Sequence, residues 1–113
     1  MHEMGLMASI FEIAENQLLG IEYQKVLKVK LKVGKLANAL EDALRMAFEA
    51  YSQDTAFAGA QLIIEEVPAT WHCNECSQEF EAEVGMLLCP RCNGRDLQLI
   101  GGRDLLLESL EVD

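Results

Sequence analysis

Four cysteines are the residues whose spacing points most directly to chemistry. Within WHCNECSQEFEAEVGMLLCPRCNG, Cys73 and Cys76 form one C-x2-C pair, and Cys89 and Cys92 form a second pair twelve residues further on. A C-x2-C turn directs two thiolates to one ion while backbone amides around the turn donate hydrogen bonds to the sulfurs. Two such knuckles facing each other complete a tetrahedral shell of four sulfurs. The spacing therefore predicts a closed metal site.

The identity of the ion is constrained by its ligands. Four thiolates in a closed shell favour structural Zn(II), although iron in a rubredoxin-like site takes the same ligands. Four free or redox-active thiols are the alternative without a metal. The four thiolate charges outweigh the two positive charges of zinc, and Arg91 and Arg95 offset part of the excess. Because the segment has no substantial apolar core, we expect it to lose its structure without the ion.

His72 directly precedes the first cysteine of this module. Its imidazole could replace a thiolate, tune the site near neutral pH, or do neither. Since four cysteines already fill the shell, a partly exposed histidine without a metal role is the simplest interpretation.

The first three residues form a second arrangement that could bind a metal. The Met1 amine nitrogen, the His2 backbone nitrogen and the His2 imidazole nitrogen can close fused five- and six-membered rings on one ion. Ni(II) and Cu(II) displace the amide proton that this requires and accept a planar set of nitrogens. The Glu3 amide nitrogen or its carboxylate can supply the next ligand. Methionine aminopeptidases do not cleave before histidine, so we expect Met1 to stay; an ordinary terminus is the alternative.

Hydrophobic periodicity predicts the helices that must position these residues. Apolar residues recur at steps of three and four from Met4 to Leu19 and again from Leu40 to Ser52, which predicts two amphipathic helices. Asn38 and Glu41 resemble a capping box at the start of the second helix.

The remaining elements predict the fold class. Alternating or continuous apolar runs predict strands at residues 26–34, 61–67 and 103–112. With the helices, they predict an α+β fold in which two helices lie on a three-stranded sheet, with an inserted zinc-ribbon-like module that carries the two knuckles. We expect residues 1–68 and 101–113 to form a nickel-binding domain and residues 69–100 to form a zinc-binding module.

Composition excludes several classes of function. The net charge of −10 over 113 residues argues against nucleic acid as a partner. No stretch approaches the roughly 20 apolar residues of a membrane span, and no secretory signal precedes the first helix, so we expect a cytoplasmic protein. No nucleophile-and-base set or phosphate-binding glycine loop is present, and four thiolates leave zinc no open position, so we do not expect an enzyme.

Five stretches of the chain occur in a recognisable order, and they are the MHE start, ALEDALRMAFEAY, AQLIIEEVPA, the C-x2-C-x12-C-x2-C module and the final GGRDLLLESLEV. Together they resemble the HypA/HybF family of hydrogenase maturation nickel metallochaperones, and the resemblance spans essentially the whole chain. The MHE start and the cysteine module are its most specific parts. The sequence departs from the family at Ser77, where glycine is commoner.

The resemblance implies a function in nickel delivery. It implies transported Ni(II) at Met1, His2 and Glu3, and structural Zn(II) at the four cysteines. Some members add an acidic ligand near the second helix, for which Glu41 and Asp42 are candidates, although Leu40 is an alternative match. Delivery would use a HypB-type nickel GTPase and end in the large subunit of [NiFe]-hydrogenase, with urease maturation proteins as further partners in some bacteria. The chain would act as a monomer or homodimer.

A zinc-ribbon interaction adaptor with no nickel role is the competing hypothesis. The lysine face formed by Lys28, Lys30 and Lys32 on the first predicted strand is its best electrostatic argument. However, the negative net charge opposes it, and no exposed aromatic series accompanies the lysines.

Overall fold

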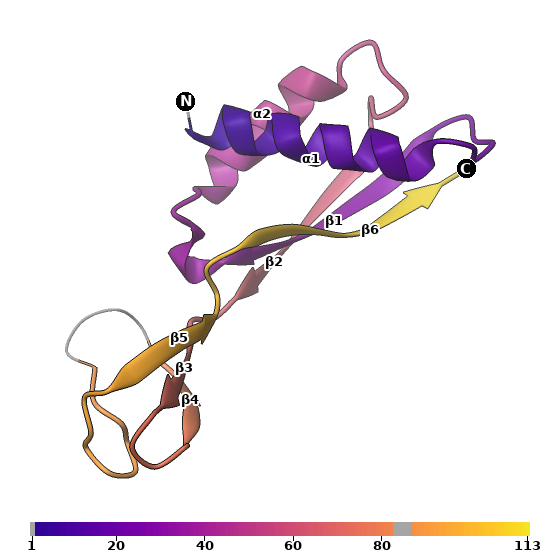
Figure 1. The fold of residues 1–113 in the computed structure, drawn as a ribbon. Helices are drawn as coiled ribbons and strands as arrows, with labels where there is room; N and C mark the ends of the chain where they lie inside the picture. The colour runs from indigo at the N-terminus through magenta and orange to yellow at the C-terminus, as the bar shows by residue number, and fades with distance from the viewer. Residues whose placement is uncertain (1, 83–86) are drawn as a thin grey trace. The chain divides into compact units, whose positions relative to one another are not determined.

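The computed structural model describes residues 2–82 and 87–113, which divide into two compact units (Figure 1). The first unit contains Met1–Lys32, Ala39–Glu65 and Leu105–Asp113, and the second contains Val33–Asn38 and Glu66–Asp104. The domain boundaries predicted from the sequence stay predictions. Neither helix in the described part of the chain has the length and apolar run that crossing a membrane requires.

The first unit confirms the predicted α+β class. Helices α1 and α2 lie on one face of a sheet with strand order β2-β1-β6 (Figure 1). The elements are α1 (His2–Leu18), β1 (Val26–Gly34), α2 (Glu41–Ser52), β2 (Gln61–Val67) and β6 (Leu105–Val112), and the ends of β1 and β2 fall in the second unit.

An aromatic cluster around Phe11 packs the two helices together. Most of the periodic residues of α1 are buried, as the sequence predicts, and they are Met7, Ile10, Phe11, Ala14 and Leu18. Met4, the first residue of the predicted stripe, is only partly buried. The Phe11 ring centroid lies 5.6 Å from that of Phe48 on α2 and 4.7 Å from that of Phe57 in the following loop. Tilted rings at these separations add favourable quadrupole contacts to the burial of apolar surface. The cluster therefore fixes how the middle of α1 lies beside α2.

The alternation along β1 separates an apolar face from a lysine face. Val29 and Leu31 are buried, and the intervening lysines form ion pairs with glutamates of β2 and β6. The Lys30 Nζ lies 3.2 Å from Glu108 and 3.4 Å from Glu65, and the Lys32 Nζ lies 3.2 Å from Glu108. These contacts offset the lysine charge. They remove the electrostatic argument for a nucleic-acid adaptor.

The predicted capping box at the start of α2 is wrong. Asn38 has the left-handed φ of 58° and ends a 3-10 turn, η1 (Lys35–Ala37), while Leu40 is the residue that precedes α2 and has no side-chain cap. The backbone N–H of Leu40 instead donates to the Glu3 carboxylate of α1 at 3.1 Å. In a capping box a glutamate of the same helix would accept this hydrogen bond.

The second unit contains a small sheet that the sequence pattern did not predict. Its strands are β3 (Thr70–Cys73), β4 (Glu79–Glu81) and β5 (Leu97–Gly101), in the order β4-β3-β5, with both pairings antiparallel. Trp71 on the central strand pairs with Phe80 and Leu99, and its indole Nε1 donates to the Ala82 carbonyl at 2.9 Å. The sheet leads the chain directly into the first cysteine knuckle.

Candidate metal centres

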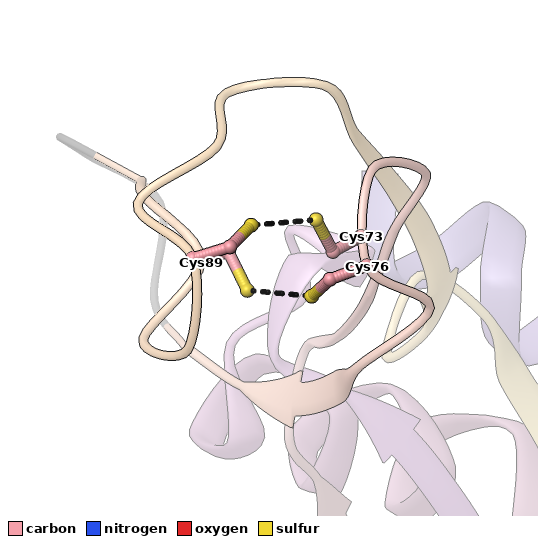
Figure 2. Close-up of side chains that lie close together, drawn as sticks. Cys73, Cys76 and Cys89 are labelled. Carbon is pink, nitrogen blue, oxygen red and sulfur yellow. Dashed lines mark hydrogen bonds between the residues drawn. The ribbon is translucent and has the colours of Figure 1, made fainter.

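The four predicted cysteines meet in one thiol cage in the second unit. All four sulfurs lie within 4.8 Å of one another. The Cys73 and Cys92 sulfurs are 3.6 Å apart, and the Cys76 and Cys89 sulfurs are 3.5 Å apart. Figure 2 shows the side chains of Cys73 and Cys76 extending from one loop toward that of Cys89 on another.

The two knuckles have the same backbone geometry. The Ser77 N–H donates to the Cys73 carbonyl and the Asn93 N–H donates to the Cys89 carbonyl, each at 2.8 Å. Ser77 and Asn93 both adopt left-handed conformations, with φ of 66° and 59°. This conformation explains why glycine suits the position of Ser77, because glycine adopts it without steric penalty.

The pKa values of the thiols are shifted by burial, by backbone hydrogen bonds and by the neighbouring thiols. Burial raises the pKa of Cys89, but backbone hydrogen bonds from Cys92 and Arg91 and the nearby thiols outweigh it and lower the pKa to about 7. The Gly94 N–H lowers the pKa of Cys92, yet burial and the other three thiols raise it to about 12. Four thiolates so close together need a cation to remain ionised together.

The cage fits a tetrahedrally coordinated ion. Zn–S bonds of about 2.3 Å would place neighbouring sulfurs about 3.8 Å apart. The observed separations of 3.5 and 3.6 Å, with every pair inside 4.8 Å, are close to that value. Cys73 and Cys89 are fully buried, whereas Cys92 is exposed. The site therefore has one corner that solvent reaches.

His72 lies beside the cage without entering it. Its Nδ1 is 3.5 Å from Glu79 Oε2 on the neighbouring strand β4, a register pair in the sheet. Of the three roles that the sequence left open for His72, the structure does not favour replacement of a thiolate.

At the other predicted site, His2 and Glu3 lie in the first turn of α1, while Met1 lies outside the described residues. The Glu3 carboxylate is held by the Leu40 N–H, and this hydrogen bond is the largest cause of the lowered pKa of Glu3. The Glu3 side chain therefore accepts the backbone hydrogen bond of the residue that precedes α2.

Neither acidic candidate on α2 belongs to a group of three metal-binding side chains among the described residues. Glu41 Oε2 accepts a hydrogen bond from Arg45 Nε at 3.2 Å, and the alternative match Leu40 is 71% exposed. Among residues 2–82 and 87–113, only the cysteines form a group of three or more metal-binding side chains with converging ligand atoms. The nickel ligands Met1, His2 and Glu3 stay a prediction.

Sequence reasoning missed the contacts that join the two knuckles outside the cage. Asn74 N–H donates to the Asp96 carbonyl at 2.9 Å, and the Asp96 N–H donates to Glu75 Oε2 at 3.3 Å. These polar residues are visible in the sequence, but no local spacing pairs positions that lie 21 residues apart.

Comparisons with known proteins agree over the full length of the chain. Residues 1–112 match the family described as "HypA: Hydrogenase/urease nickel incorporation, metallochaperone, hypA". The chain is 47% identical to "Hydrogenase maturation factor HypA" of Desulfitobacterium hafniense, covering 100% of this chain and 99% of that protein. It is 39% identical to the protein of that name in Synechococcus elongatus, covering 99% of each chain.

Solved structures agree with the fold. "Solution structure of the Ni metallochaperone HypA from Helicobacter pylori" aligns with a TM-score of 0.71 at 21% identity, covering 99% of this chain and 97% of that chain. A second, "Solution structure of HypA protein", aligns with a TM-score of 0.75 at 22% identity, covering 99% and 96%. At these identities the likeness concerns the fold alone.

Proposed function

The chain belongs to the HypA family of nickel-incorporation metallochaperones for hydrogenase maturation, and from that premise we propose that it carries Ni(II) at its amino terminus. Met1, His2 and Glu3 are the proposed nickel ligands, and Zn(II) in the four-cysteine cage is the proposed structural ion. The observation that carries the proposal is the match over residues 1–112, which includes both the MHE start and the cage.

Zinc in the cage would hold the second unit together. In its cysteine segment, residues 69–100, the only buried side chains among the described residues are Ala69, Cys73 and Cys89. Such a segment cannot be stabilised by apolar burial alone, and a tetrathiolate ion supplies the missing folding free energy. With four protein ligands, zinc would have no open position for a substrate. These features support a structural ion in a carrier without catalytic activity of its own.

The start of α1 suits nickel bound through backbone nitrogens. The first four N–H groups of a helix have no carbonyl partner within the helix. Since α1 begins at His2, loss of the amide protons of His2 and Glu3 would break no hydrogen bond to a carbonyl of the helix, although the Glu3 N–H would lose its hydrogen bond to the Glu3 carboxylate. Two amidate nitrogens would balance the charge of Ni(II), and the Met1 amine and the His2 imidazole would complete a set of four nitrogens.

The hydrogen bond of Glu3 supports its amide nitrogen as the ligand. Leu40 N–H occupies one carboxylate oxygen, so a carboxylate ligand would compete with the start of α2 for this side chain. The Glu41 carboxylate is likewise hydrogen-bonded to Arg45, which would compete with a metal ion for it. We therefore assign no carboxylate to nickel in the protein alone.

Delivery would take place in the cytoplasm with other maturation proteins. A HypB-type GTPase is the proposed nickel-handling partner, and the large subunit of [NiFe]-hydrogenase is the proposed recipient, with urease maturation proteins as further candidates. Ligation by nitrogens suits transfer, because protonation or a competing ligand releases the ion.

The chain offers a matched pair of variants that tests the nickel site, since it has only two histidines. Loss of a group outside the ligand shell weakens metal binding by up to roughly a hundredfold. Because His2 is a proposed direct ligand, we expect His2→Ala to weaken Ni(II) binding by more than that. His72→Ala should bind Ni(II) as the unmodified protein does. Isothermal titration of the zinc-loaded protein measures both. Undiminished affinity in His2→Ala would overturn the proposal and favour the adaptor hypothesis.

A further inference from the structure

A hydrogen-bonded link joins the two cysteine knuckles on the outside of the cage. From the first knuckle, the Asn74 N–H and side-chain Nδ2 donate to the carbonyl and carboxylate of Asp96, at 2.9 and 3.2 Å. In return, the Asp96 N–H donates to Glu75 Oε2 at 3.3 Å. Asp96 follows the second knuckle by four residues, so these bonds fix one loop against the other.

The Glu75 carboxylate also packs against Gly94. A Cβ at Gly94 would overlap Glu75 Oε2 and would lie 3.1 Å from the Cys92 sulfur. The φ of Gly94 is outside the left-handed region, unlike that of Gly102, so an L-residue could adopt the backbone conformation there. The carboxylate needs the space that a side chain at Gly94 would fill.

Comparison of the two knuckles indicates that glycine at position 94 is needed to make room for the Glu75 carboxylate and is not needed to form the knuckle. The Cys73 N–H donates to the Gln78 carbonyl at 2.8 Å, and the Cys89 N–H donates to the Gly94 carbonyl at 2.9 Å. Gln78 and Gly94 thus occupy equivalent positions, and the first knuckle forms with a glutamine there. What distinguishes the second knuckle is the Glu75 carboxylate lying on it.

Cys92 is the cage ligand that solvent and competing ligands reach most easily. It is exposed, whereas Cys73 and Cys89 are buried and Cys76 is intermediate. An ion leaving a closed tetrathiolate site would therefore first lose the Cys92 sulfur. The loop that Glu75 and Asn74 hold through Asp96 is the loop that directly follows Cys92.

We propose that Glu75 is a positioning residue that latches the Cys92 loop onto the first knuckle and so slows loss of the metal through the exposed corner. The inference rests on the proposed metal site of the four cysteines. Glu75 acts through its hydrogen bond and its packing on Gly94. Its negative charge is not needed, because a further anion beside thiolates is repulsive.

Four variants of the full chain separate the latch from its alternatives. Glu75→Ala removes the hydrogen-bond acceptor, Gly94→Ala displaces the carboxylate while leaving Glu75 in place, and Glu75→Gln keeps an oxygen acceptor without the charge. Glu81→Ala, on β4 of the same unit, is the control for removing an exposed glutamate. The readouts are the transfer rate of Zn(II) to a chromogenic chelator and the absorption spectrum of the Co(II)-substituted protein.

We expect Glu75→Ala and Gly94→Ala to release Zn(II) roughly fivefold faster, the effect of one hydrogen bond. Glu75→Gln and Glu81→Ala should match the unmodified protein, and all variants should keep the tetrathiolate Co(II) spectrum. Unchanged release from Glu75→Ala and Gly94→Ala would overturn the latch, as would Glu75→Gln releasing the ion as fast as Glu75→Ala. If the unmodified protein lacks a tetrathiolate Co(II) spectrum, the metal site itself fails, and the latch with it.

Discussion

Glu3 offers two different groups to its surroundings, a backbone nitrogen and a carboxylate. The carboxylate accepts the N–H of Leu40 at 3.1 Å, and the positive end of α2 favours an ionised side chain there. In our proposal the backbone nitrogen binds nickel and the carboxylate joins the two helices. One residue would therefore couple the position of the proposed metal-binding terminus to the start of α2.

Substitution of Glu3 separates these two roles. We expect Glu3→Ala to lower the thermal unfolding midpoint by roughly a few degrees, because Leu40 loses its acceptor. Ni(II) stoichiometry should stay unchanged, because the backbone nitrogen remains. Glu3→Gln keeps an oxygen acceptor and should recover most of the midpoint. Calorimetry and nickel titration measure the two effects, and loss of nickel binding by a folded Glu3→Ala would identify the carboxylate as the ligand.

At the scale of helices and strands, the long periodic elements could be predicted from the sequence. Helix α1 and strand β1 follow the periodicity of apolar residues, and the cage follows from the cysteine spacing. The strands of the second unit are only three to five residues long, too short to show a pattern. The start of α2 depends on Glu3, 37 positions away, so local capping signals could not reveal it.

The lysine face of β1 gives a prediction about pH. The hydrogen bond from Lys30 is the largest cause of a pKa of Glu108 below the ordinary carboxyl value. Because the pKa is lower in the folded state, the stabilisation is fully present above the unfolded-state pKa and is lost as the pH falls through the folded-state pKa.

We therefore expect the free energy of unfolding of Glu108→Gln to fall less steeply than that of the unmodified protein as the pH decreases through the folded-state pKa of Glu108. Glu15→Gln, an exposed glutamate on α1, is the control and should leave the decline as it is in the unmodified protein. Urea unfolding at a series of acidic pH values gives the comparison. An equally steep decline in Glu108→Gln would show that the ion pairs with Lys30 and Lys32 add nothing to stability.

At the scale of the whole molecule, the two units depend on different sources of stability. The first has an apolar core between two helices and a sheet, whereas the cysteine segment of the second has few buried side chains. Trp71, the one tryptophan of the chain, lies on β3 of the second unit. Its fluorescence therefore reports on the second unit, while far-ultraviolet circular dichroism reports on α1 and α2.

Removal of zinc should affect these two signals differently. We expect a strong chelator to shift the Trp71 emission toward longer wavelength as the cysteine segment unfolds, and re-addition of Zn(II) to reverse the shift. Most of the helical signal should persist, because the core of the first unit contains no metal ligand. Unchanged Trp71 emission in protein shown to be free of metal would contradict a structural role for the ion.

The central claim is that a free terminal amine and the adjacent imidazole hold nickel together. The most direct test titrates Ni(II) into zinc-loaded protein with a free Met1 amine and into the same protein acetylated at that amine. We predict one equivalent of Ni(II), with the ligand-field absorption of a nickel complex with nitrogen ligands, for the free amine, and loss of this binding after acetylation while zinc stays in place. Equal Ni(II) binding by both forms, or Ni(II) found only among the thiolates, would contradict the account.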